Sequence, residues 1–186
     1  MKSSYKENRY NNVFKALAFC IKPKRIVEFG ILEAYSLVSW IESTDNDTQI
    51  EAYDIFEDFP YNGASYPDIT ERFSDYQNVA IKRGDFFGTE KQFKNGEIDI
   101  LHIDIANNGA TYQYAIDHYM QKVAPTGVCI LEGGSTARDN VYWMQEFDKP
   151  PIQDVICDKK NQQKYNILVL EDYPSITLIT HKQGKP

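Results

Sequence analysis

Apolar positions along this chain follow two different periods, one typical of buried strands and one typical of helices. Short apolar and β-branched runs predict five strands, in the segments RIVEF, QIEAYDIF, NVAIKRGDFF, EIDILHIDI and GVCILEGG. Between these runs, apolar residues recur at every third or fourth position, most clearly over 13–21, 34–41 and 112–123. That spacing predicts amphipathic helices, the last of which we expect to run to Val123 and to close at the turn APTG.

The order of these elements predicts the fold class. Strands that alternate with helices indicate βαβ units, and near-continuous apolar strands such as ILHI and VCIL indicate burial on both faces of a parallel sheet. The last two runs, YNILVL and SITLIT, are joined only by EDYP, which is too short for a parallel crossover. The segment IQDVIC competes weakly as the sixth strand. The prediction is a doubly wound α/β fold with a mostly parallel seven-stranded sheet, an antiparallel C-terminal hairpin strand and helices on both faces.

Length and composition favour one domain over residues 1–186. We expect an N-terminal helix over 1–22, a core over 23–134, and a helix and hairpin over 135–186. Hydrophobic residues make up 42% and charged residues 25%, and no apolar run is long enough to cross a bilayer, so a membrane is not an expected partner. The polar N-terminal segment lacks the apolar stretch of a secretory signal, which favours a cytoplasmic location.

Charge and cysteine content narrow the possible partners. The net charge is −7, and Lys and Arg are scattered, whereas nucleic-acid-binding proteins usually carry a basic face. Cys20, Cys129 and Cys157 are far apart in sequence, which favours reduced thiols over a disulfide or zinc framework. The 13 Tyr and 10 Phe residues suit a core, a homodimer interface or stacking on a flat ligand, and composition does not choose among these.

Acidic residues end all five of the predicted parallel strands, where ligands bind in open α/β sheets. Any one of these acidic residues, taken alone, is as often a helix cap or a solvated loop residue as it is a ligand-binding residue. Together they predict a polar rim suited to a ligand that carries hydroxyl groups and a positive charge. The rim comprises Glu28 with Gly30, then Asp54, Gly84 with Asp85, Asp104, and Glu132.

Two positions on this rim suggest a nucleoside. Asp54 follows Gly30 by 24 residues (54 − 30), the distance at which a nucleotide-binding βαβ unit presents a carboxylate to ribose hydroxyls. Gly30 lets the backbone approach a ligand closely. Glu28, expected beside it on the rim, favours an amine over a pyrophosphate.

The segments VEFGILEAYS, EAYDIF, KRGDFF and LHIDIANNGATY, followed by PTGVCILEGG, resemble the ordered motifs of class I S-adenosylmethionine (SAM)-dependent methyltransferases, which have a Rossmann-like fold. The resemblance covers about Arg25 to Gly134. It implies SAM as the cofactor. The resemblance implies that Glu28, Gly30, Tyr35 and Ser36 hold the methionine part of SAM. It implies that Asp54 holds the ribose and that Asp85 and Phe86 hold the adenine. It also implies that Asp104 faces the methyl donor and that Ile55 and Gly84 are further cofactor-binding positions.

The segment LHIDIANNGATY is most similar to small-molecule O-methyltransferases that use a divalent cation. This resemblance implies Asp104 and Glu132 as ligands of a Mg²⁺ ion, while the third ligand position holds Gly133, which has no side chain. Water, Asn107 or Asn108 is the expected substitute. Ala34 stands where the family usually has a second glycine.

The expected reaction is methyl transfer to a small-molecule acceptor, by O-methylation, with Asp104 polarising or deprotonating the acceptor hydroxyl. We expect His102, inside an apolar strand, to be a hydrogen-bonded core residue. The aromatic loop from Tyr53 to Tyr66 suits either a lid or an ordinary surface loop.

Two other functions stay open at this point. One is a catalytically silent binding protein with the methyltransferase fold, suggested by Ala34 and by the missing third metal ligand. The other is a nicotinamide-dependent oxidoreductase, which FGILEAYS disfavours because it lacks the G-x-G-x-x-G pattern.

Overall fold

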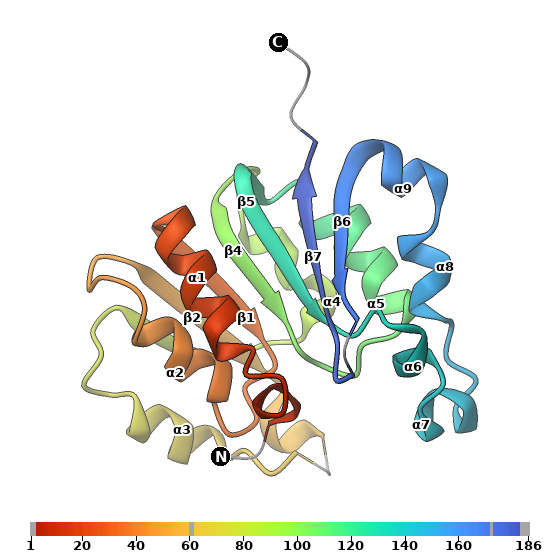
Figure 1. The fold of residues 1–186 in the computed structure, drawn as a ribbon. Helices are drawn as coiled ribbons and strands as arrows, with labels where there is room; N and C mark the ends of the chain where they lie inside the picture. The colour runs from red at the N-terminus through yellow and green to blue at the C-terminus, as the bar shows by residue number, and fades with distance from the viewer. Residues whose placement is uncertain (1–2, 60–61, 172, 183–186) are drawn as a thin grey trace.

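The structure is a computed structural model that describes residues 3–59, 62–171 and 173–182. In this described part, seven strands form one sheet in the order β3-β2-β1-β4-β5-β7-β6 (Figure 1). The first five strands are parallel, while β7 lies antiparallel between β5 and β6. The predicted sheet and hairpin are therefore confirmed. The strands are β1 Arg25–Phe29, β2 Gln49–Asp54, β3 Val79–Arg83, β4 Ile98–Ile103, β5 Val123–Glu132, β6 Tyr165–Leu170 and β7 Ile176–His181.

Helices cover both faces of the sheet, and each face has its own apolar core. On one face, α1 (Asn11–Ile21), α2 (Tyr35–Ile41) and α3 (Tyr66–Arg72) pack against side chains such as Ile26 and Ile100. On the other face lie α4 (Phe86–Thr89), α5 (Gly109–Tyr114) and α8 (Ile152–Ile156). Short helices fill the connections: η1 Ser4–Lys6, η2 Phe56–Asp58, η3 Glu90–Gln92, α6 Thr136–Asp139, α7 Tyr142–Glu146 and α9 Lys159–Lys164.

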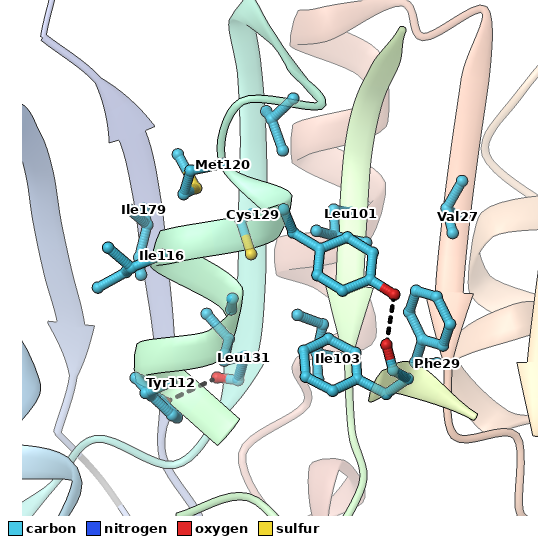
Figure 2. Packing of buried hydrophobic residues seen from close by; sticks show 14 of the residues in the cluster. Val27, Phe29, Leu101, Ile103, Tyr112, Ile116, Met120, Cys129, Leu131 and Ile179 are labelled. Atoms are coloured by element: carbon cyan, nitrogen blue, oxygen red, sulfur yellow. Dashed lines mark hydrogen bonds between the residues drawn. The ribbon is translucent and has the colours of Figure 1, made fainter. Parts of the chain in front are cut away.

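Strand alternation divides the apolar residues between these two cores. In β1, Ile26 packs under α1, and its neighbour Val27 faces the opposite side of the sheet. Figure 2 shows Val27, Leu101 and Cys129, from three neighbouring strands, all pointing toward this second side. The chain therefore buries both faces of its parallel strands, as their continuous apolar pattern predicts.

The helix expected to run through Val123 is shorter than predicted. After α5 the chain makes one π-helical turn, η4 (Ala115–Tyr119), and β5 already begins at Val123. The APTG segment lies inside β5 as an irregularity, because the pairing with β4 shifts from Ile98 opposite Val123 to Ile100 opposite Val128. The prediction of a helix-closing turn here was wrong.

The segment IQDVIC is helix α8 and not a strand. Two prolines precede it, and both carboxylate oxygens of Asp139 accept hydrogen bonds from the first helical amides, Ile152 N at 2.8 Å and Gln153 N at 2.9 Å. Satisfying these free amides stabilises the helix start, and the partner comes from 13 residues earlier in the chain.

Candidate functional site

A cavity of about 770 Å³ lies at the carboxyl ends of β1, β2 and β4 and beside the turn after β3. Its volume falls in the range of sites for small molecules and cofactors, roughly 300 to 1,000 Å³. The cavity brings together nine of the eleven residues that the sequence predicts for the site, and leaves out Glu28 and Glu132. The nine are Gly30, Tyr35, Ser36, Asp54, Ile55, Gly84, Asp85, Phe86 and Asp104.

Gly30 sits where the turn after β1 passes against the end of β4. Its φ is +91°, and a Cβ added there would lie 1.8 Å from the Asp104 carbonyl oxygen. Only glycine fits this close approach and this backbone conformation. The close contact between the turn after β1 and the end of β4, on which this part of the cavity depends, therefore requires glycine at position 30.

The same turn contains two residues other than glycine in left-handed conformations. Leu32 has φ +43° and Ala34 has φ +63°, and α2 starts directly after them, at Tyr35. Ala34 thus adopts the conformation that glycine favours, at a cost of roughly 1 kcal/mol. The turn therefore stays tight although Ala34 stands where class I methyltransferases usually have a second glycine.

Asp54 ties the turn after β1 to the loop after β2. One carboxylate oxygen accepts from Ile31 N at 2.7 Å, and the other accepts from Phe56 N and Asn62 Nδ2, both at 2.7 Å. The side chain is buried and lines the cavity. A carboxylate has about four acceptor sites, so one remains for a ligand hydroxyl.

An aromatic wall closes the cavity beyond β3. The Phe86 ring stacks on Tyr119 with centroids 4.8 Å apart and planes 10° from parallel, and the Tyr119 hydroxyl donates to the Phe86 carbonyl oxygen at 2.7 Å. Asp85 accepts from Phe87 N at 3.1 Å, which holds the turn that carries both phenylalanines. Phe87 is half exposed and also lines the cavity. A flat ring is the natural ligand for this wall.

Asp104 directly follows β4 and is one of the residues that line the cavity. Burial among protein groups raises its pKa to about 7, and the nearby negative charge of Glu132 adds to this effect, while His102 and Tyr5 act in the opposite direction. A carboxyl group with this pKa changes charge near neutral pH. It is the titratable group of the cavity best suited to respond to a bound cation.

Glu28 is not on the rim, which corrects our expectation. It is fully buried on the α1 and α2 face, because strand alternation places it on the same side as Ile26. Its carboxylate accepts from Ser36 Oγ and lies 2.8 Å from His102 Nδ1. The other ring nitrogen of His102 lies 3.0 Å from the Tyr5 hydroxyl, which confirms His102 as a hydrogen-bonded core residue. Glu28 therefore contacts a cavity-lining residue, Ser36, but does not itself line the cavity among the described residues.

Glu132 also points away from the cavity and is paired with Arg138. Arg138 Nε donates to the two carboxylate oxygens at 2.8 and 3.1 Å, and Nη2 donates to the second of them at 3.0 Å. Both side chains are buried. The expected metal ligand is thus already neutralised by a guanidinium group.

The remaining donors do not complete a magnesium site. Asn107 Nδ2 donates to the carbonyl oxygens of Ile103 and Glu132, which leaves Oδ1 as one buried oxygen without a hydrogen-bond partner among the described residues, and Asn108 Oδ1 accepts from Ala110 N at the start of α5. Across the described ranges, no three acidic, histidine or cysteine side chains are grouped so that they could hold a metal ion. The donor set that the resemblance implied does not fit Mg²⁺, which needs several oxygen ligands.

Several cavity residues were not predicted from the sequence. Ser3 and Ser4 reach the cavity from the N-terminal segment, and Ala110, Thr111, Lys149 and Pro150 line the far end beside Asn108, which the resemblance had already brought in. Phe59 and Asn62 come from the loop that we considered as a lid, of which residues 60 and 61 lie outside the described part. The lid therefore stays a prediction. Nothing local in the sequence marks the N-terminal or far-end residues, because tertiary packing brings them to the cavity.

Comparison with solved structures identifies the fold. A methyltransferase from Podospora anserina bound to S-adenosylhomocysteine (SAH) matches with a TM-score of 0.65 at 18% identity, over 98% of this chain and 80% of that chain. A SAM-dependent O-methyltransferase from Thermotoga maritima matches with a TM-score of 0.65 at 15% identity, over 100% and 69%. This chain has the fold of class I methyltransferases.

A further neighbour has a different type of acceptor. A protein from Clostridium thermocellum, described as a candidate rRNA methylase, matches with a TM-score of 0.67 at 11% identity, over 100% of this chain and 99% of that chain. The exclusion of nucleic acid therefore stays a prediction. No protein-family model matches the sequence, and no curated protein matches it either.

The expectation about membranes is tested only in part. Among the helices that the structure describes, none has the length and apolar character needed to span a lipid bilayer. The expected cytoplasmic location and homodimer remain predictions.

Proposed function

We propose that this protein is a SAM-dependent methyltransferase that methylates an oxygen atom of a small-molecule acceptor. The observation that carries the proposal is the single cavity, which unites a glycine turn, the Asp54 carboxylate, the aromatic wall at Phe86 and the Asp104 carboxyl group. These groups suit, in turn, the methionine, ribose, adenine and sulfonium parts of SAM. The class I methyltransferase fold and its SAM-using structural neighbours support the same cofactor.

The charges around the cavity favour a cationic nucleoside. Among the described residues that line it, three carry carboxyl side chains, Asp54, Asp85 and Asp104, and one carries a basic side chain, Lys149. SAM carries a positive sulfonium, whereas a nicotinamide dinucleotide carries a negative pyrophosphate that these acids would repel. The antiparallel β7 also departs from the usual sheet order 3-2-1-4-5-6 of dinucleotide-binding enzymes.

The acceptor would lie at the far end of the cavity, beyond Asp104. Residues of α5 and of the segment before α8 line this end, and among the described residues that line the cavity Lys149 is the only basic one. An ammonium group placed there suits an acceptor that carries a carboxylate or another anionic group. The proposed acceptor is therefore a small hydroxyl compound with a negative charge.

Methyl transfer from a sulfonium is an in-line displacement, so the protein mainly orients the two reactants. Asp104 holds the cationic cofactor and takes or weakens the proton of the acceptor hydroxyl. A pKa of about 7 suits both tasks, because the group can carry a charge and exchange a proton at neutral pH. The neighbouring aromatic residues keep water from the transferring methyl group.

Thermal unfolding with SAM, SAH and NAD⁺ tests the proposal, since a ligand that binds the native state raises the melting temperature. We expect SAM and SAH to raise it and NAD⁺ to leave it unchanged. A response to NAD⁺ alone would favour an oxidoreductase. Binding of SAM without any methyl transfer, across phenolic, carboxylic and RNA acceptors, would favour the silent binding protein.

A pair of variants links the result to the cavity. Asp104→Asn should weaken SAM binding about tenfold, because it removes a negative charge next to the sulfonium. Asp75→Asn, at an exposed position outside the cavity, is the matched control and should leave SAM binding unchanged. Equal affinity in the two variants would remove Asp104 from the proposed site.

A further inference from the structure

Arg138 connects three separate elements of the fold. Besides its hydrogen bonds to Glu132 at the end of β5, Nη2 donates to the carbonyl oxygen of Asn107 in the loop after β4, at 3.0 Å. The guanidinium group also lies over the Trp143 ring of α7, 4.8 Å from its centroid. Arg138 is only 5% exposed. One buried cation therefore holds together the ends of β4 and β5 and a helix outside the sheet.

Gly133 makes room for this cation. Its φ is +101°, and a Cβ at this position would lie 2.8 Å from Ile152 Cδ1 and 3.1 Å from Arg138 Cγ. A side chain at position 133 and the packed Arg138 would thus compete for the same space. The glycine that removes the third metal ligand is therefore also the residue that leaves space for the buried Arg138 side chain.

The charge of Arg138 is permanent under ordinary conditions. Burial alone would lower the pKa of the guanidinium, but the hydrogen bonds and the negative charge of Glu132 outweigh burial and raise it. A divalent ion bound to Glu132 would have to displace these hydrogen bonds, and it would then face a second positive charge in a buried environment.

We propose that the Arg138 guanidinium takes the place that a divalent cation has in metal-dependent O-methyltransferases, so that this protein binds its ligands and works without a metal ion. The part that concerns ligand binding rests on the proposed function. One consequence concerns the acceptor. With no ion to hold two adjacent oxygens at once, a compound with a single hydroxyl should serve as well as its vicinal diol counterpart.

Thermal unfolding of the wild-type protein, dialysed against EDTA, tests the proposal directly. Mg²⁺, Mn²⁺ and Ca²⁺ are each titrated to about 10 mM, with and without SAH. We expect each ion to shift the melting temperature by less than about 1 °C and to leave the SAH response unchanged. A saturable rise with any of these ions, lost in Asp104→Asn, would overturn the proposal.

A variant that removes the guanidinium provides the complementary test. Arg138→Met leaves Glu132 without its partner beside Asp104, so we expect a lower melting temperature that divalent ions now raise. The matched control is Arg138→Met combined with Glu132→Gln, in which the ions should have no effect. If the single variant gained no response to ions, Arg138 would not be what excludes them, and the proposal would be wrong.

The two proposals can fail separately. A wild-type protein that does not respond to SAH, with or without ions, contradicts the proposed function. A protein that responds to SAH only when a divalent ion is present keeps the proposed function and contradicts the role of Arg138. If Arg138→Met does not fold, the wild-type titration still decides between these results.

Discussion

Asp104 and Glu132 end neighbouring parallel strands, yet they have opposite electrostatic surroundings. Asp104 faces the cavity, and burial raises its pKa to about 7. Glu132 faces away and is neutralised by three hydrogen bonds from Arg138. The position of an acid at a strand end thus does not determine its role. What decides is whether the chain supplies a cation, as it does for Glu132, or leaves the charge for a ligand to balance.

The largest effect should come from removing the cation on the Glu132 side. Arg138→Ala leaves a buried carboxylate without its partner, and we expect a loss of about 3 to 5 kcal/mol in the free energy of unfolding. Urea denaturation at neutral pH measures this loss. Arg83→Ala, which breaks an exposed pair with Glu57, should cost no more than about 1 kcal/mol. Similar losses in both variants would mean that the buried pair contributes no more to the free energy of unfolding than an exposed pair.

On the Asp104 side, removing the charge should stabilise the protein. The folded state holds a proton on Asp104 up to about pH 7, whereas an unfolded Asp loses it near pH 4, at its ordinary pKa. The contribution of this group to stability is therefore full below about pH 4 and is lost as pH rises to about 7.

Asp104→Asn should accordingly match the wild-type protein at about pH 4 and exceed its stability by about 1 to 2 kcal/mol at about pH 8. Urea denaturation across this range, without ligand, checks the prediction. A variant that is less stable than the wild type at the higher pH would show that the Asp104 carboxylate is well paired in the folded protein.

The same raised pKa should make cofactor binding depend on pH. SAM is a cation at its sulfonium and favours the ionised form of Asp104, so its affinity should rise by up to about tenfold between pH 6 and pH 8. Isothermal titration calorimetry measures this change, and Asp104→Asn should reduce or abolish it. An equally steep pH dependence in the variant would assign the effect to another group.

The smallest effect on stability should come from Lys149, the basic residue at the far end of the cavity. Lys149→Gln should change the free energy of unfolding by less than about 0.5 kcal/mol, since the side chain is exposed. It should weaken binding of anionic acceptors several-fold while SAM affinity stays the same. Competition binding with a hydroxybenzoate and the matching hydroxybenzamide compares an anionic acceptor with a neutral one. Lys159→Gln is the control at another exposed position. Equal effects on both compounds would contradict an anionic acceptor.

Most of the sheet and most of the cavity could be predicted because both depend on local patterns. Apolar β-branched runs mark the strands, and the residues just after parallel strands must meet at one edge of the sheet. That logic places Gly30, Asp54, Asp85 and Asp104 around one cavity, where the structure has them. The glycine at position 30 is also understandable from the close approach of two chain segments.

The errors have physical causes of their own. The two-residue period of β1 already places Glu28 beside Ile26 and under the helices, and that pattern could have corrected the rim prediction. The partner of Glu132 could not have been found in this way. Arg138 lies six residues further on, beyond a Gly-Gly turn and in the short helix α6, so the pairing depends on how this loop folds back. Contacts of that kind leave no periodic signal.

The position of the N-terminal segment has a practical consequence for experiments. Ser3 and Ser4 line the cavity, and Tyr5 anchors them through its hydroxyl group next to His102. A tag joined directly to Ser3 would therefore start beside the cavity and compete with added ligands for it. Since β7 runs antiparallel to the parallel strands, its last residue, His181, lies at the opposite end of the sheet. A tag placed after it leaves the cavity clear for binding assays.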